Sequence, residues 1–401
     1  MAVIRHEARG AARKPGGAVR RHVRQLNFYG KKSSSEQWPK TIRGIFPWGR
    51  KQEEFELPFP VMQWAQVAHN YHRSTILLGN GASIAVSPSF SYGSLLDYAQ
   101  QRGLLATDVR RLFHFFGTSD FELILRLVWQ ASNVNRALQI PDNSTRQAYL
   151  NVRECLIQAV RDVHPEHNLV NPQLPSMYQF LKGFDTVLSL NYDLLVYWTM
   201  TYGLNVDDGH AFKDCFQWNG GFDDNWGRYR ERYREQTNTL VFYPHGSLAL
   251  CRNAVEQESK IHNAGAGLLE AILQEWCSER VVPLFVSEGT MQQKVSSIQS
   301  SYYLSTVYRE VLASQRVALT LYGWGISEHD RHLLRRMRGT GIHRVAVSVF
   351  RGDQVYCNYA YQALQDDLGP VQVDFFDSES PGCWIHAAPE PTPVGLGQFG
   401  I

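Results

Sequence analysis

The stretch that decides the expected fold is Thr75-Ile76-Leu77-Leu78-Gly79-Asn80-Gly81-Ala82-Ser83. Its first four residues carry no charge and predict a short buried β-strand, since a strand covered on both faces is continuously apolar. Glycines follow where the strand ends, and they allow the backbone to approach an anion that binds to N–H groups. A plain tight turn is an equal alternative, because the complete glycine fingerprint of dinucleotide-binding proteins is absent. The candidate binding residues of this loop are Gly79, Asn80, Gly81, Ala82 and Ser83.

Short apolar runs recur along the chain and alternate with helical patterns. Strands are also predicted at 186–190, 240–243, 281–286, 316–322 and 344–350. Helices are predicted near 296–314, 328–337 and 357–367. Such alternation is typical of a parallel sheet that is covered on both faces. We therefore expect an α/β fold with a Rossmann-like parallel sheet, helices on both faces and a large helical insertion.

Changes of composition divide the chain into three expected parts. Residues 1–50 are a basic, weakly ordered leader, and residues 385–401 are a loose tail rich in Pro and Gly. The domain between them, residues 57–384, contains a helical insertion at about 94–182, where apolar residues recur at helical spacing. An irregular insertion rich in Trp, Asn and Gly is expected at about 205–238.

The composition is that of a globular protein and gives no sign of export. The 401 residues are 44% hydrophobic and 19% charged, and no apolar run reaches the length of a membrane-spanning helix. The N-terminal arginines lack the apolar stretch of a secretory signal, so we expect a cytoplasmic protein without membrane contact. The 6 cysteines lie far apart, which argues against a zinc knuckle or a disulfide framework. Neither the 14 histidines nor the carboxylates show metal-ligand spacing, and no metal is expected.

Charge is distributed unevenly along the chain. Residues 1–51 carry thirteen Lys and Arg against two Glu, about +11, which leaves about −9 for the rest of a chain whose net charge is +2. A body of that sign gives no reason to expect a nucleic-acid surface, so nucleic acid would bind only through the basic leader. A disordered extension without such a role is the alternative.

Several polar groups follow predicted strands and should meet at one edge of the sheet. Asn191 and Asp193 follow the strand at 186–190, and His245 follows the strand at 240–243. Two further loops follow strands in the same way. The carboxyl ends of parallel strands lie at one edge, where open α/β sheets bind their ligands. The candidate residues of those two loops are Ser287, Glu288, Gly323, Trp324 and Gly325.

Three segments together resemble the signature of the sirtuin superfamily, and they occur in the sirtuin order. They are Leu78 to Ser83, Ser189 to Asp193, and Pro244 to Ser247. The resemblance covers about residues 75–350. It implies that the first segment holds the phosphates of NAD, that the second corresponds to the TQNxD-type segment, and that His245 is the catalytic histidine.

The chain departs from the deacylase branch of that superfamily. It has no Cys-x-x-Cys pairs for the structural zinc module of true sirtuins, which argues against lysine deacylation. It is more similar to bacterial sirtuin-like proteins, several of which hydrolyse NAD in anti-phage defence. Residues 283–290 and 321–330 also resemble segments of a poorly characterised sirtuin-like bacterial family.

The residue types suit cleavage of the nicotinamide–ribose bond. Hydrolysis needs a clamped pyrophosphate, a leaving group that is already positively charged, and a group that directs water to an oxocarbenium-like carbon. Asn191 can hold that water or the ribose hydroxyls, and His245 can act as general base because an unperturbed imidazole titrates near neutral pH. Asp193 belongs to the candidate NAD-binding residues and is expected to be a buried acceptor that orients the Asn191 loop. Without these neighbours, Asn191 would be a turn residue and His245 a packed histidine.

We therefore predict an NAD glycohydrolase that takes NAD as substrate and releases nicotinamide and ADP-ribose. The alternatives are a module that senses NAD or ADP-ribose without cleaving it, and an enzyme of ADP-ribosyl transfer or deacylation. A homo-oligomer or an activating partner protein is expected, because the helical insertion and the leader offer surfaces beyond what catalysis requires. Asp120 and Glu122 are interpreted as a solvated helix face, with closure over the site as the alternative, and Lys294 as a surface lysine that could instead reach a phosphate.

Overall fold

The computed structural model describes residues 58–231, 237–262, 267–286 and 288–388. The predicted leader, residues 389–401 of the predicted tail, and Ser287 lie outside the described residues. So do residues 232–236 of the predicted irregular insertion. Among the helices of the described ranges, none combines the length and the apolar content needed to span a membrane.

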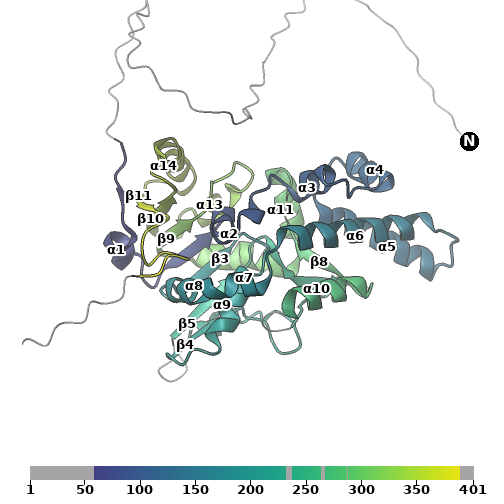
Figure 1. The fold of residues 1–401 in the computed structure, drawn as a ribbon, viewed down its shortest axis with the longest axis horizontal. Coiled ribbons are helices and arrows are strands. Elements are labelled where there is room, and N and C mark those ends of the chain that lie inside the picture. The colour runs from purple at the N-terminus through teal and green to yellow at the C-terminus, as the bar shows by residue number, and fades with distance from the viewer. Residues whose placement is uncertain (1–57, 232–236, 263–266, 287, 389–401) are drawn as a thin grey trace, which may run out of the picture. The chain divides into compact units, whose positions relative to one another are not determined.

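The central sheet has eight strands, and every neighbouring pair is parallel. They are β1 (Val61–Met62), β2 (Thr75–Leu78), β3 (Thr186–Ser189), β4 (His210–Lys213), β5 (Thr237–Phe242), β9 (Val317–Tyr322), β10 (Ile342–Val349) and β11 (Gln372–Asp377). Their order across the sheet is β1-β11-β10-β9-β2-β3-β5-β4, and helices flank the sheet (Figure 1). The predicted α/β, Rossmann-like fold is thereby confirmed.

The order of the strands reverses beside β2. From β2 the chain continues to β3 and β5 on one side, and it then returns to β9, β10 and β11 on the other. This is the doubly wound order of dinucleotide-binding sheets, in which ligands bind where the strand order reverses. The loops that follow β2 and β9 flank this switch point, and both are rich in glycine.

A second sheet, which is antiparallel, follows the loop that carries His245. It consists of β7 (Glu258–Lys260), β6 (Gly246–Asn253) and β8 (Val281–Phe285), in this order across the sheet. The prediction that the apolar run at 281–286 belongs to the parallel sheet is therefore wrong. A continuous apolar run indicates burial on both faces but not the direction of pairing. The strand β8 nevertheless ends beside His245, because the N–H of Val286 donates to the carbonyl oxygen of His245 at 2.7 Å.

Six α-helices fill the stretch at 94–182, where a helical insertion is expected. They are α3 (Leu95–Gln101), α4 (Thr107–Phe116), α5 (Phe121–Ala137), α6 (Ser144–Val163), α7 (His167–Val170) and α8 (Leu174–Leu181). The long helices α5 and α6 pack against each other (Figure 1). Side-chain caps begin α3 and α5: the Ser94 hydroxyl accepts from the N–H of Asp97 at 2.9 Å, and the Asp120 carboxylate from the N–H of Leu123 at 3.1 Å.

The remaining α-helices flank or connect the strands. They are α1 (Trp64–Val67), α2 (Asn80–Val86), α9 (Leu195–Gly203), α10 (Leu268–Cys277), α11 (Met291–Gln299), α12 (Tyr302–Thr306), α13 (His332–Met337) and α14 (Gln354–Leu368). The single helix predicted near 296–314 is thus α11, α12 and two short helical turns. Hydroxyl caps explain this division, because Thr290 accepts from the N–H of Gln293 and Ser301 from the N–H of Leu304.

The expected irregular insertion at about 205–238 contributes a strand to the central sheet. Its residues His210 to Lys213 form β4, which pairs in parallel with β5. After β4 in the sequence, the described chain has an isolated bridge between Phe216 and Phe222 and a short 3-10 turn at Trp226–Arg230. A four-residue edge strand is too short for its pattern to be recognised within a polar segment.

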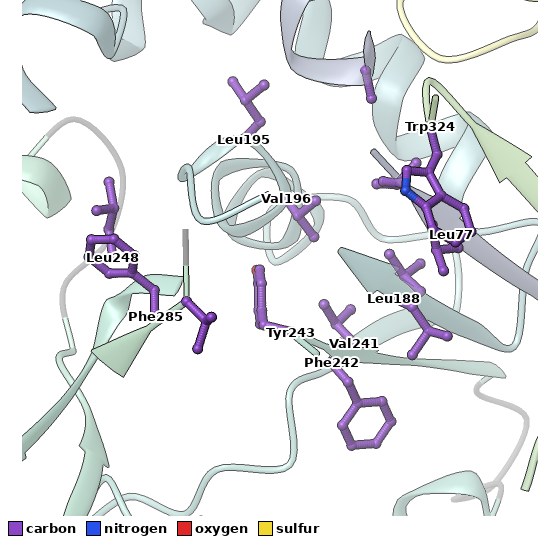
Figure 2. Close-up of a cluster of buried hydrophobic side chains, with 14 of the residues drawn as sticks. Leu77, Leu188, Leu195, Val196, Val241, Phe242, Tyr243, Leu248, Phe285 and Trp324 are labelled. Carbon is purple, nitrogen blue, oxygen red and sulfur yellow. The ribbon is translucent and has the colours of Figure 1, made fainter. Parts of the chain in front are cut away.

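Apolar packing on both faces explains why the central strands are continuously hydrophobic. Val241 and Phe242 are neighbours on β5, and their side chains point to opposite faces of the sheet (Figure 2). Both are fully buried. Next to them, the ring of Tyr243 stacks on Tyr197 of α9, with ring centroids 5.1 Å apart. The two-sided burial that the apolar runs predict therefore holds for this strand.

The interpretation of Asp120 and Glu122 as surface residues is wrong, because both side chains are buried. The Glu122 carboxylate lies 3.6 Å from the guanidinium of Arg126 and 3.8 Å from that of Arg252. Burial and the neighbouring Asp120 raise the pKa of Glu122 to about 8, against the attraction of the two arginines. Charged residues in a helix usually face solvent, but α5 packs against β8, and Glu122 meets Arg252 of β6.

Candidate functional site

A cavity of about 370 Å³ lies at the switch point of the sheet. The loops that follow β2, β3, β5, β8 and β9 in the sequence all contribute to its wall. We call it the His245 cavity. Ten of the predicted site residues line it: Gly79, Asn80, Gly81, Asn191, Asp193, His245, Glu288, Gly323, Trp324 and Gly325. Ala82 and Ser83 lie behind this wall, and Ser287 is outside the described residues.

The glycines at the switch point allow two loops to pack backbone against backbone. The N–H of Gly81 donates to the carbonyl oxygen of Gly323 at 2.7 Å, and the N–H of Gly79 to that of Tyr322 at 2.9 Å. A Cβ atom on Gly79 would lie 2.5 Å from the Cα of Trp324, which no side chain tolerates. The N–H of Gly81 is thus already used within the protein and is not free for a phosphate, which differs from the expected role of this loop.

Asn191 ties the end of β3 to the glycine loop. Its side-chain Nδ2 donates to the carbonyl oxygen of Gly79 at 3.0 Å and to the Ser83 hydroxyl at 2.8 Å. The Ser83 hydroxyl in turn donates to Asp193, whose other carboxylate oxygen accepts from the N–H of Leu195 at 2.9 Å. Burial raises the pKa of Asp193 to about 6, although these two bonds favour its charged form. Both N–H donors of the Asn191 amide are therefore occupied, and only its oxygen is left for a ligand.

His245 is a buried histidine at the cavity wall. Its side chain is 5% exposed, and its Nε2 has no hydrogen-bond partner. That nitrogen lies 3.8 Å from Oδ1 of Asp330. Burial lowers the pKa of His245 to about 3, with Asp330 acting in the opposite direction. The ring is consequently neutral at pH 7, so it can accept a proton, but it is a weaker base than an exposed histidine.

Lys294 is an internal partner of Asp330, so its interpretation as a surface lysine is wrong. The ammonium of Lys294 donates to Oδ1 of Asp330 at 2.7 Å, and its side chain is 9% exposed. Burial raises the pKa of Asp330, but His245 and Lys294 together hold it below its ordinary value. Both residues line the His245 cavity. Asp330 was missed by the sequence argument, although it lies in the loop behind β9 that also contains Gly323.

One cluster at this wall has the composition of a metal-binding site. His245, Asp330 and His332 each offer one ligand atom, and these three atoms lie within 4.8 Å of one another. No metal-ligand spacing is recognisable in the sequence, because His245 is separated from the other two residues by more than eighty positions. Only the fold brings them together.

The start of the helical insertion covers part of the cavity. Tyr92 and Ser94 lie in its wall, and the hydroxyl of Tyr92 is hydrogen-bonded to that of Tyr192. Next to Ser94, the N–H of Leu95 donates a hydrogen bond to the carboxylate of Glu288. Burial raises the pKa of Glu288 to about 7. Its second carboxylate oxygen is buried without a partner, so it is available to a ligand or water.

The profile of one protein family, described as a domain of unknown function (DUF4917), matches residues 76–384. The chain belongs to this family. The match starts in β2 and ends at Trp384, so the whole wall of the His245 cavity lies inside the DUF4917 domain. The comparison with curated proteins gives no match.

A second cavity of the DUF4917 domain, about 460 Å³, lies beside the first. The two share Gly81 and the loop from Gly323 to Gly325. We call it the Ser348 cavity, because Ser348 at the end of β10 lines it and its hydroxyl accepts from the N–H of Gly323 at 2.9 Å. Much of the remaining wall is apolar or aromatic: Ile84, Ala85, Tyr322, Phe350, Tyr356 and Ile385.

Proposed function

We propose that this protein binds NAD at the switch point of its sheet and hydrolyses the nicotinamide–ribose bond. The observation that carries the proposal is that Asn191 and His245, from different strands, line one cavity together with the glycine loop behind β2. A doubly wound sheet binds dinucleotides at this place. The sequence resemblance to sirtuin-like NAD hydrolases supports the same chemistry.

The two cavities offer room for the two halves of a dinucleotide. Both border on Gly81 and Gly323, whose backbones pack directly against each other at the switch point of the sheet. A pyrophosphate at this border would let the nicotinamide ribose enter the His245 cavity. The adenosine would then take the Ser348 cavity, whose apolar and aromatic walls suit a purine base.

The proposed reaction is attack of water on the anomeric carbon as the N-glycosyl bond breaks. The bonding electron pair leaves with nicotinamide, which departs as a neutral molecule. His245 accepts the proton of the attacking water at Nε2, and Asp330 stabilises the imidazolium that forms. Asn191 contributes its amide oxygen to the water or to a ribose hydroxyl, and its two N–H donors keep the glycine loop in place.

Release of nicotinamide from NAD by the purified full chain tests the proposal. We expect His245→Ala to lower kcat by about 10²- to 10⁴-fold, the usual contribution of a general base, while NAD still binds. The matched control is His343→Ala, which removes an exposed histidine on β10 and should leave kcat unchanged. NAD that binds but stays intact with the unaltered chain, both with and without candidate activators, would contradict hydrolysis.

A module that binds NAD or ADP-ribose without cleaving it is the second candidate. Two observations favour it: the Asn191 amide donors are occupied within the protein, and burial makes His245 a weak base. Calorimetric binding of NAD without nicotinamide release, in the presence and absence of candidate activators, would establish this function. ADP-ribosyl transfer would instead appear as labelled protein after incubation with labelled NAD.

We further propose that an NAD hydrolase of this kind acts in anti-phage defence and is restrained through a homo-oligomer or a partner protein. The helical insertion offers exposed apolar side chains for such contacts, among them Phe115 on α4 and Leu138 at the end of α5. A monomer that hydrolyses NAD at full rate without any partner would contradict the restraint.

A further inference from the structure

Three ligand groups meet at the wall of the His245 cavity, and the two imidazoles among them lack hydrogen-bond partners for three ring nitrogens. The ring nitrogens of His332 and the Nε2 of His245 are buried, and none has a hydrogen-bond partner. His245 and His332 are each 4% exposed. The two rings lie 5.9 Å apart between centroids, with the Asp330 carboxylate close to both. Buried polar groups without partners are costly, and an ion or water is the usual explanation.

Two imidazoles and one carboxylate form a ligand set that suits a divalent transition-metal ion, Zn²⁺ in particular. Zn–N and Zn–O bonds are about 2.0–2.2 Å, so ligand atoms around one ion lie roughly 3.3 Å apart. The three ligand atoms lie within 4.8 Å, and small side-chain rotations would bring them to bonding distance. His245 and Asp330 line the cavity, which provides an entry path and an open coordination position.

Lys294 competes for the same carboxylate. Its ammonium lies 2.7 Å from Oδ1 of Asp330, where it neutralises the negative charge of the cluster. A metal ion at Asp330 would have to displace this ammonium or share the carboxylate with it. Lys294 should therefore weaken metal binding, whereas His332 should strengthen it.

We propose that His245, Asp330 and His332 form a binding site for a divalent transition-metal ion, and that the bound ion inhibits the enzyme. The inhibitory part rests on the proposed function: the lone pair of His245 Nε2 that binds the ion is the one that would accept the proton of water. The binding part does not depend on that function. His332 is a ligand in this site and does not line the His245 cavity.

Calorimetric titration of the full chain with ZnCl₂, after removal of metals with a chelator and without NAD, tests the site. We expect one ion per chain, at least tenfold weaker binding in His332→Ala, and unchanged binding in the surface control His343→Ala. Lys294→Met should bind more tightly than the unaltered chain. Equal affinity of His332→Ala and the unaltered chain would overturn the proposal. If His332→Ala fails to fold by circular dichroism, unchanged or weaker binding by Lys294→Met overturns it instead.

Nicotinamide release with increasing ZnCl₂ then tests inhibition. The unaltered chain should lose activity as the site fills, and His332→Ala should need at least tenfold more Zn²⁺ for the same loss. Zn²⁺ that binds through His332 without inhibiting would overturn the inhibitory part. Failure of the proposed function is a distinct result, because the metal-free chain would then release no nicotinamide at all.

Discussion

The two cavities beside the Gly323–Gly325 loop differ in what their walls contain. The wall of the His245 cavity has ionisable groups, among them Asp330, Lys294 and Glu288, and their surroundings lower the pKa of Asp330 and raise that of Glu288. The wall of the Ser348 cavity is largely apolar or aromatic. Charges in a low-dielectric wall cost free energy and are useful where a reaction changes charge. We infer that the first cavity serves chemistry and the second serves recognition.

The largest expected effect comes from disrupting the backbone contact between Gly81 and Gly323, at the border that the cavities share. In Gly323→Ala, the new Cβ would lie 2.2 Å from the backbone nitrogen of Ala82, and the residue has a φ of +66° that favours glycine. We expect a loss of roughly 2–5 kcal/mol in the free energy of unfolding and loss of NAD binding, measured by urea denaturation and calorimetry.

The matched control for this substitution is Gly325→Ala in the same loop. A Cβ on Gly325 would meet no atom within 4 Å, so the unfolding free energy should stay within about 0.5 kcal/mol of the unaltered chain. Similar destabilisation by both substitutions would show that the effect of Gly323→Ala does not come from the close packing of its backbone against Gly81 and Ala82.

Filling the Ser348 cavity should affect binding alone. Ile84 on α2 lines this cavity and is 37% exposed, so Ile84→Trp can place its ring there without disturbing the core. We expect KM for NAD to rise roughly tenfold with kcat unchanged, because a contact remote from the reacting bond contributes equally to ground and transition states. Ile84→Val is the control, and its KM for NAD should stay within about twofold of that of the unaltered chain. A fall in kcat with unchanged KM would contradict the division between recognition and chemistry.

Glu288, in the wall of the His245 cavity, should make the stability of the protein depend on pH. Burial raises its pKa to about 7 from an ordinary value of 4.5, so the folded chain holds this proton more tightly than the unfolded chain. Its contribution to stability is therefore fully present below about pH 4.5 and is lost as pH rises through about 7.

Urea denaturation at pH 5 and pH 8 measures this contribution. From pH 5 to pH 8, the free energy of unfolding of the unaltered chain should fall by on the order of 1–3 kcal/mol more than that of Glu288→Gln. The amide keeps an acceptor for the N–H of Leu95, so the comparison isolates the charge. Parallel changes in both proteins would mean that Glu288 does not titrate in this range.

The smallest expected effect concerns the cover of the His245 cavity. The Ser94 hydroxyl caps α3, and Ser94→Ala should cost about 1 kcal/mol of unfolding free energy. Ser301 lines neither cavity, and Ser301→Ala, which removes the equivalent cap of α12, should cost a similar amount. Because α3 begins at the wall of the His245 cavity, we expect Ser94→Ala also to raise KM for NAD, whereas Ser301→Ala should not. An equal KM in both variants would mean that the Ser94 cap contributes to stability alone.

Apolar runs and strand-end loops were enough to predict much of this molecule. The apolar runs that form β2, β3, β5, β9 and β10 predict strands of a parallel sheet. Because Asn191 and His245 each follow one of these strands, the sequence also predicts that they lie at the same edge of the sheet. These inferences succeed because period and composition report burial of a strand and its end directly. They failed for β8, because an apolar run carries no information about the partner strand or its direction.

What the sequence by itself determined is therefore the fold class and the edge of the sheet where ligands bind. Only the tertiary structure decided that Lys294 pairs with Asp330, that Asp330 faces His245, and that the Asn191 amide is occupied by the glycine loop. The physical reason is that burial and charge at these positions come from segments far apart in the chain, whereas local patterns report only what each segment can do alone.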